Sequence, residues 1–120
     1  SLLRRDRKPF EATQRLKQAL DKLTGDDEYT MRVKCRVLDD LGLAHQHQGE
    51  LEEARTRFQE ALNIRERSGD TIGTAQSIVN LGRIDVAFKD DESGAERARI
   101  ALELLRPLPP TSTHANAHAL

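Results

Sequence analysis

The sequence predicts an all-α fold in which about five helices pair into antiparallel hairpins that stack within a single domain. Two observations support this prediction: the chain repeats its own pattern after about 40 residues, and its apolar residues recur at helical spacing. The composition agrees, because apolar residues make up 37% of the chain and aromatic residues only 3%. A core of Leu, Ile, Val and Ala suits stacked helices better than a β-sandwich.

The clearest unit of the repeat is the stretch 38–62, LDDLGLAHQHQGELEEARTRFQEAL, in which Gly49 separates two amphipathic patterns. When this stretch is moved forward by 40 residues, its leucines and small residues fall on similar residues, such as Gly42 on Gly82. When it is moved back by 42 residues, its second half matches residues 12–20. Self-similarity at this period is typical of a solenoid built from stacked units.

The first helix is predicted over residues 9–24, after a basic linker or the end of a preceding helix over residues 1–8. Pro9 suits a helix start because it fixes φ and lacks an N–H that the first turn does not use. We expect Gly25 to end the helix in the left-handed conformation. One apolar stripe runs along this helix, formed by Ala12, Leu16, Ala19, Leu20 and Leu23.

The best-preserved repeat is predicted over residues 27–67, with helices at roughly 27–47 and 50–67. Asp26 or Asp27 is expected to accept hydrogen bonds from the free N–H groups of the first helix. The expected inward residues are Met31, Cys35, Leu38, Leu41 and His45 in the first helix, and Leu51, Ala54, Phe58, Ala61, Leu62 and Ile64 in the second.

A second, degenerate repeat is predicted over residues 71–106, with helices from Asp70 to about Phe88 and over about 92–106. Prolines after the second helix stop it, and residues 107–120 are expected to form a turn followed by the start of another helix or a disordered tail. The expected inward residues are Ala75, Ile78, Leu81, Gly82, Ile84 and Val86, then Ala98, Ala101, Leu102 and Leu105.

Charge and cysteine content restrict the class of protein. Nineteen basic residues against 20 acidic ones give a net charge of −1, which provides no general attraction for nucleic acid or an anionic membrane. Cys35 is the single cysteine, so an intramolecular disulfide is impossible and we expect a cytoplasmic setting. No apolar run is long enough to span a bilayer, and the charged start lacks the apolar region of a signal peptide. Because the chain begins with Ser1, a targeting segment can lie upstream.

This pattern resembles the tetratricopeptide repeat, in its longer form of about 40 to 42 residues found in scaffold proteins and multidomain bacterial regulators. In that family a unit has a helix A with Leu-Gly and a helix B with Ala-x3-aromatic-x2-Ala-Leu. The resemblance implies a right-handed solenoid and a non-catalytic module that binds a protein or peptide without a cofactor. The residues that fit are Leu41, Gly42, Gly49, Ala54, Phe58, Ala61 and Leu62.

The second repeat departs from the family pattern at four positions. Gly94 replaces the first alanine of helix B, Ala98 replaces the aromatic residue, and Lys89 replaces the turn glycine. Asp85 stands where the family prefers tyrosine. We expect Asp85 and the missing aromatic residue to weaken the packing of this hairpin.

The resemblance also implies a peptide groove lined by the helix A residues. Two rows at helical spacing fit this role, and the alternative is an ordinary solvated helix face. Asn80 would hydrogen-bond a ligand backbone, and Arg36 or Arg83 would meet a carboxylate. The family's clamp for C-terminal carboxylates is not expected, because Asp39 and Val79 occupy the place of its basic residue. The two rows are Arg36, Asp40, Leu43 and His47, and Gln76, Asn80, Arg83 and Ala87.

No catalytic, metal or cofactor site is expected. His114 and His118 are one helical turn apart but lack a third ligand, so we interpret them as surface residues. The carboxylates of 39–40 and 90–92 have no partner for acid and base roles, and the second group lies where a helix N-terminus favours negative charge. Cys35 is interpreted as a core thiol rather than a nucleophile.

The basic cluster of Arg4, Arg5, Arg7 and Lys8 contains no aromatic residue for base stacking, so we interpret it as a solvated linker without direct nucleic-acid binding. The first functional hypothesis is a fragment of a larger bacterial signalling or transcriptional regulator. The alternative is a stand-alone adaptor or scaffold without a switch role. Exposed repeat edges would favour self-association.

Overall fold

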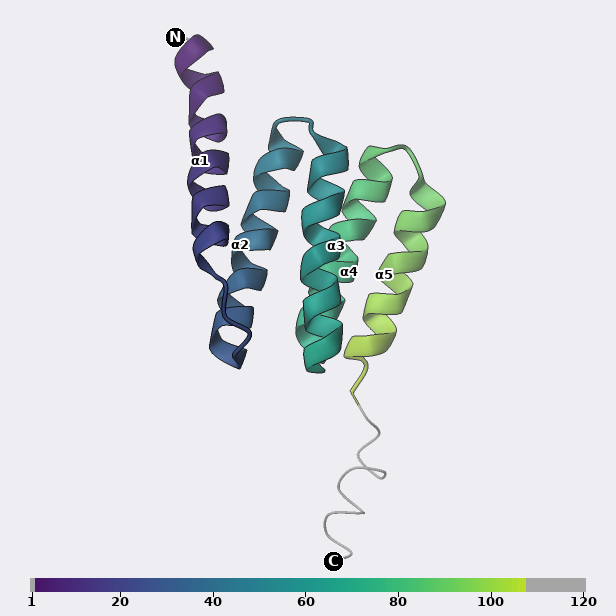
Figure 1. Ribbon diagram of the computed structural model, residues 1–120. Helices are drawn as coiled ribbons and strands as arrows, with labels where there is room; N and C mark the ends of the chain where they lie inside the picture. Colours follow the sequence, from purple (N-terminus) through teal and green to yellow (C-terminus); the bar gives the residue numbers. More distant parts are fainter. Residues whose placement is uncertain (1, 108–120) are drawn as a thin grey trace, which may run out of the picture.

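The computed structural model describes the backbone of residues 2–107 and the side chains from residue 10 onward. Within that range the chain forms five α-helices and no strand, so the all-α prediction is confirmed (Figure 1). The helices are α1 (Leu2–Lys22), α2 (Glu28–His47), α3 (Leu51–Ser68), α4 (Thr71–Ala87) and α5 (Asp91–Leu105).

Successive helices run in opposite directions and pack side by side (Figure 1). The helix α1 forms one edge of the array and α5 the other edge, with α2, α3 and α4 between them. Each helix packs chiefly against the next one in the sequence. The two hairpins α2–α3 and α4–α5 correspond to the two predicted repeats.

Local capping sets the starts of three helices. The Asp27 carboxylate accepts a hydrogen bond from Thr30 N at 3.0 Å, ahead of α2. Asp70 and Asp90 do the same ahead of α4 and α5, at distances of 2.8 and 3.1 Å to the backbone nitrogens of residues 73 and 93. A side chain that accepts from these N–H groups satisfies donors that the helix itself leaves free. The observed bounds of α2 to α5 agree with the predicted ones to within one or two residues.

The start of α1 was predicted wrongly. The helix begins at Leu2 rather than at Pro9, and it continues through the proline. Leucine, arginine and lysine have high helix propensity, whereas Pro9 lies inside the helix, where it removes one backbone hydrogen bond and crowds the carbonyl group four residues before it. Gly25 does not take the left-handed conformation expected of it; positive φ occurs instead at Gly49 and Gly69.

The core of the first hairpin follows the predicted stripes. Phe58 is fully buried, and its ring lies so close to Gly42 that an added Cβ would be only 2.5 Å from it. The glycine is therefore required for this helix–helix approach. Two buried clusters fill the array: one of Cys35, Leu38, Ala61 and Ile64, and one of Ala54, Phe58, Leu62, Ala75, Ile78, Leu81, Ile84 and Ala101.

Four residues expected to face inward are exposed instead. Val86 and Leu105 each keep 49% of their surface in solvent, Leu102 keeps 70%, and Ala98 is also exposed. Their spacing does place them on one side of the α4–α5 hairpin, but no further helix of the described chain covers that side. Helical periodicity predicts which residues share a face, and it does not predict whether a neighbour is present.

Candidate functional site

The first predicted groove row lies on the side of α2 that points away from the core. Arg36, Asp40, Leu43 and His47 are all exposed, and Leu43 keeps 40% of its surface in solvent. Leu38 on the same helix is fully buried. This row is therefore available to a partner, and it presents one cation, one anion, one apolar side chain and one imidazole.

The second row occupies the matching side of α4. Gln76, Arg83 and Ala87 are exposed and Asn80 is partly buried, whereas Leu81 between them is 1% exposed. The two rows lie on different helices that are separated in sequence by α3. Their residues offer amide, guanidinium and carboxylate groups, which are the groups that bind extended peptide backbone and charged side chains.

Arg65 of α3 joins the two groove helices. Its Nη1 lies 2.8 Å from Asp39 Oδ2 of α2 and donates a hydrogen bond of 2.8 Å to Ser77 Oγ of α4. The Arg65 side chain is 10% exposed and that of Asp39 19%, while Ser77 is fully buried. One buried guanidinium thus fixes the spacing of α2 and α4 and, with it, the spacing of the two rows.

Asp39 therefore forms an ion pair that the sequence did not indicate. Its ion pair with Arg65 does not restore a normal titration, however, because burial raises the pKa of the Asp39 carboxyl more strongly than the Arg65 guanidinium lowers it. Asp39 Oδ1 is buried and has no hydrogen-bond partner within the part of the chain that the structure describes. Asp39 therefore has a structural role, in which Oδ2 pairs with Arg65 and Oδ1 is left without a hydrogen bond from the described residues.

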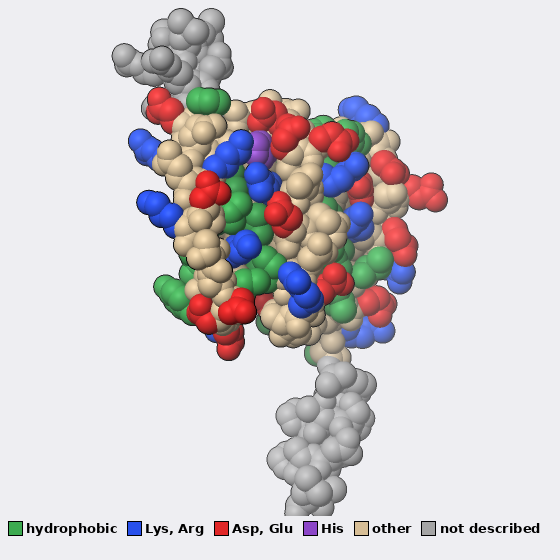
Figure 2. Space-filling view, in the orientation of Figure 1, with side chains coloured by type: hydrophobic (Ala, Val, Ile, Leu, Met, Phe, Trp, Pro, Cys, Tyr) green, Lys and Arg blue, Asp and Glu red, His purple; other side chains and the backbone are tan. Residues whose placement is uncertain are grey.

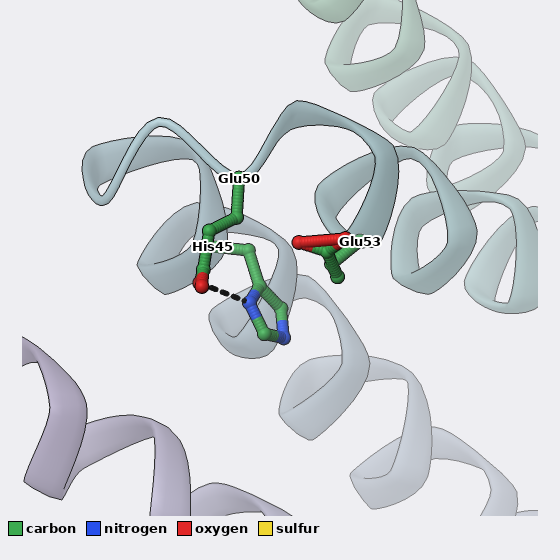
Figure 3. A group of neighbouring side chains, drawn as sticks. All are labelled: His45, Glu50 and Glu53. Atoms are coloured by element: carbon green, nitrogen blue, oxygen red, sulfur yellow. Dashed lines mark hydrogen bonds and ion pairs between the residues drawn. The ribbon is translucent and has the colours of Figure 1, made fainter.

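One group of side chains has the composition of a metal site (Figure 3). Donor atoms of His45, Glu50 and Glu53 all lie within 4.8 Å of one another, and His45 is 4% exposed. The His45 Nδ1 and Glu50 Oε1 atoms are 2.9 Å apart, and the Glu53 carboxylate points toward the ring. A hydrogen-bonded His–Glu pair, together with acidic groups at the start of α3, explains the arrangement without an ion. His45 is the buried packing residue that the sequence predicted.

The other reactive groups have structural environments. The Cys35 Sγ atom lies 3.9 Å from the Ala61 carbonyl oxygen. Burial raises the pKa of this thiol, which favours the protonated, unreactive form. Asp90 caps α5, and hydrogen bonds from Ser93 lower the pKa of its carboxyl. His114 and His118 lie outside the described residues, as do the side chains of the basic cluster 4–8.

The second repeat replaces the family residues with its own contacts. Asp85 is 7% exposed and forms an ion pair with Arg97, whose Nε lies 2.7 Å from Asp85 Oδ2, so Asp85 joins α4 to α5. Lys89 adopts φ of 70°, the left-handed conformation that the turn glycine of the family would take without strain. An added Cβ at Gly94 would lie 2.7 Å from a Val86 methyl group, so this glycine allows the close approach of the two helices.

Comparison with known families decides the identity of the fold. The tetratricopeptide-repeat family model matches residues 34–106, which include most of α2 and all of α3, α4 and α5. The chain belongs to the tetratricopeptide repeat family. The resemblance predicted from Leu41, Gly42 and the small residues of α3 is therefore confirmed, while the longer form of the repeat stays a prediction.

Tetratricopeptide repeats are protein–protein interaction modules, so the chain is an interaction module of this kind. No curated protein and no solved structure matches the chain. Among the described residues, none of the helices combines the length and the hydropathy needed to cross a membrane. Acidic and basic side chains alternate over the face shown in Figure 2, without a large area of one sign.

Sequence reasoning missed Arg65, which is the residue that connects the two groove helices. The signal was present, because Arg65 continues the stripe that begins at Ala54 and passes through Phe58 and Ala61 at intervals of four, three and four residues. A charged residue in phase with a buried stripe needs a partner. Its partner, Asp39, could not be identified from one sequence, since the two are 26 positions apart.

Proposed function

We propose that the outward faces of α2 and α4 in this tetratricopeptide repeat module bind a peptide segment of a partner protein. The observation that supports this proposal is the pair of exposed polar rows at matching positions of two consecutive helices. Arg65 holds these helices at a fixed spacing through Asp39 and Ser77, so the rows are pre-organised. A surface that needs no reordering loses less entropy when it binds.

In this proposal, Asn80 bonds the ligand backbone through its side-chain amide, which offers both donors and an acceptor. Arg83 or Arg36 meets a carboxylate of the ligand. Leu43 supplies an apolar contact near the middle of the α2 row, since it keeps 40% of its surface exposed. The groove therefore favours an extended peptide with mixed polar and apolar side chains.

A partner is first identified by photo-crosslinking from position 83. Its affinity for the module is then measured by calorimetry. Asn80→Ala with Arg83→Ala removes two contacts of about 1 kcal/mol each, so we expect the affinity to fall at least about tenfold. Glu66→Ala on α3 is the matched control, because Glu66 is exposed and lies outside both rows. An unchanged affinity in the double variant would show that the groove assignment is wrong.

We further propose that the module belongs to a larger bacterial signalling or transcriptional regulator, in which partner binding is relayed to an effector domain; the alternative is a stand-alone adaptor or scaffold. The full-length gene distinguishes the two. A nucleotide-binding or DNA-binding domain on the same polypeptide supports the regulator, and repeats alone support the adaptor.

Self-association through an exposed edge is a separate part of the proposal. The side of α4 and α5 that bears Val86, Leu102 and Leu105 is apolar and exposed, and it supports contact between two copies. Sedimentation velocity should show a concentration-dependent dimer that Leu102→Glu abolishes. A monomer at all concentrations would rule out this contact.

A further inference from the structure

Three side chains that can ligate a metal ion meet at the turn that joins α2 to α3 (Figure 3). His45 lies in the last turn of α2, Glu50 directly precedes α3, and Glu53 lies in the first turn of α3. Gly49 has φ of 77°, a left-handed conformation that lets the chain reverse between the two helices. The three side chains lie outside both groove rows, so what they bind is independent of the proposed peptide groove.

The two carboxylates of this cluster carry charge that no described arginine or lysine neutralises. Their donor atoms lie within 4.8 Å of each other. The nearby arginines of α3, Arg55 and Arg57, pair with other carboxylates at 3.7 and 3.2 Å. Within the described part of the chain, His45 is the only basic side chain that pairs with Glu50, and Glu53 has no ion pair. Two like charges at this separation repel each other, and a cation between them would remove the repulsion.

His45 supplies the fixed member of the cluster. Its side chain is only 5% exposed, and its Nδ1 atom lies 2.9 Å from Glu50 Oε1. This contact orients the imidazole ring and Glu50, but it does not involve Glu53. The Glu53 carboxylate points toward the ring without a hydrogen bond from any of the described residues. The His–Glu pair therefore leaves a second acidic ligand beside the ring.

The donor set fits a divalent ion of the zinc type. Zn²⁺ binds imidazole nitrogen and carboxylate oxygen at about 2.0–2.2 Å, and sites with three protein ligands leave one position for water. Two ligands of a tetrahedral ion are then about 3.4 Å apart. The distance of 2.9 Å between His45 Nδ1 and Glu50 Oε1 is already close to this spacing, and the exposed Glu53 side chain can approach by rotation. The two carboxylates also balance the charge of the ion.

We propose that His45 Nδ1, Glu50 and Glu53 bind one Zn²⁺ ion at the α2–α3 turn, with water in the remaining position. The ion takes the place of a proton on Nδ1: a neutral imidazole keeps its proton on Nε2, and an imidazolium releases one proton to water. The bound ion ties the end of α2 to the start of α3 and so stabilises the hairpin. Mg²⁺ and Ca²⁺ prefer oxygen ligands alone and should not compete.

Calorimetric titration of the chelator-treated chain with ZnCl₂ should show saturable binding of one ion per chain. All titrations use the chain that also carries His114→Gln and His118→Gln, so that this pair of histidines contributes no second ion. NMR of the imidazole nitrogens should show a change at His45 on binding, which identifies the site without altering a buried residue.

Glu53→Gln is the test variant, because Glu53 is exposed and its replacement leaves the core unchanged. Loss of this ligand should weaken Zn²⁺ binding at least about tenfold. Glu52→Gln is the matched control, since Glu52 is an exposed acidic residue of the same turn that lies outside the cluster. Excess ZnCl₂ should raise the urea midpoint of the control and have much less effect on Glu53→Gln.

Saturation by one ion that Glu53→Gln weakens and Glu52→Gln does not would support the site. No saturable binding at millimolar Zn²⁺, equal affinity in Glu53→Gln, or binding without a change at the His45 nitrogens would each overturn the proposal. Equal binding of Mg²⁺ would overturn it too, because the cluster would then be only a negatively charged surface. The peptide groove is tested separately by Asn80→Ala with Arg83→Ala, so either proposal can fail without the other.

Discussion

Replacing Arg65 with leucine tests whether one buried guanidinium holds the two groove helices together. The substitution removes the donor that lies 2.8 Å from both Asp39 Oδ2 and Ser77 Oγ. Removing one member of a buried ion pair costs about 3–5 kcal/mol, because the remaining charge is left in a poorly solvated place. The Asp39 side chain keeps 19% exposure, so we expect a loss near the lower limit, about 3 kcal/mol of unfolding free energy.

The second repeat provides the design of a compensating variant. Forty residues further along the chain, Val79 stands in the place of Asp39 and Leu105 in the place of Arg65. Asp39→Val with Arg65→Leu therefore removes both charges and replaces them with apolar side chains that another copy of the repeat already uses. Such replacement of a buried pair is often neutral. Ser77 loses its Arg65 donor in this variant as well, so we expect the double variant to be about 1–2 kcal/mol less stable than the wild type, yet more stable than Arg65→Leu alone.

Urea unfolding followed by circular dichroism measures these free energies. Arg67→Leu is the control on the same helix, because Arg67 is exposed and its Nε bonds only the Asn63 carbonyl oxygen; its effect should stay within about 0.5 kcal/mol. If Arg65→Leu costs less than about 1 kcal/mol, or if the double variant is as unstable as the sum of the single ones, the ion pair is not what holds these helices.

The pH dependence gives a second measurement on the same pair. Burial raises the pKa of Asp39 in the folded chain, so the folded state holds this proton more tightly than the unfolded state does. The stabilisation from this group is thus fully present below the ordinary value of 3.8 and is lost as the pH rises through the raised pKa. Without Arg65 the pKa should rise further. The stability difference between wild type and Arg65→Leu should therefore shrink on acidification, and a difference that grows instead would contradict this reasoning.

Three further predictions concern packing and capping. Gly42→Ala should destabilise the fold by about 1–3 kcal/mol in urea unfolding, because the new Cβ would lie 2.5 Å from the Phe58 ring. Gly82→Ala should cost clearly less, since the nearest atom to its Cβ would be 3.3 Å away; a reversed order would show that the Phe58 contact is not what requires glycine. Asp90→Ala should reduce stability at neutral pH and not at pH 2, because hydrogen bonds from Ser93 lower the pKa of this carboxyl in the fold, and thermal unfolding at the two pH values tests this.

The helices could be predicted because their signals are local. Asp27, Asp70 and Asp90 each bond a nitrogen three residues ahead, so the sequence alone contains both partners. The Leu-Gly pair and the small residues of α3 are spaced along single helices, which is why the family could be named from them. The start of α1 was predicted wrongly because proline favours the first turn of a helix and costs about 3 kcal/mol in the interior, yet α1 begins at Leu2 and continues through Pro9.

The contacts that set the candidate site are not local, and the sequence did not reveal them. Arg65 meets residues 26 positions before it and 12 positions after it, and Asp85 pairs with Arg97 across 12 positions. Periodicity shows that Arg65 faces inward but not which carboxylate is opposite. The groove rows were chosen by helical phase, and seven of their eight residues are exposed while Asn80 is partly buried. A pocket of about 1070 Å³ beside Arg36 could not be predicted in this way, because it depends on the relative placement of α2 and α3.

The ion pair also restricts which helix can lie against each hairpin. In the α2–α3 hairpin, Arg65 pairs with Asp39 and also donates a hydrogen bond to the hydroxyl group of Ser77 on α4, which packs against this hairpin. The α4–α5 hairpin has Val79 and Leu105 at those positions, and its open side is a pocket of about 300 Å³ lined mainly by apolar and small residues. A helix like α4 placed there would bury its serine without a partner, which costs about 1–3 kcal/mol. The two sides therefore select different neighbours: the first a helix with a hydroxyl, the second one with apolar side chains.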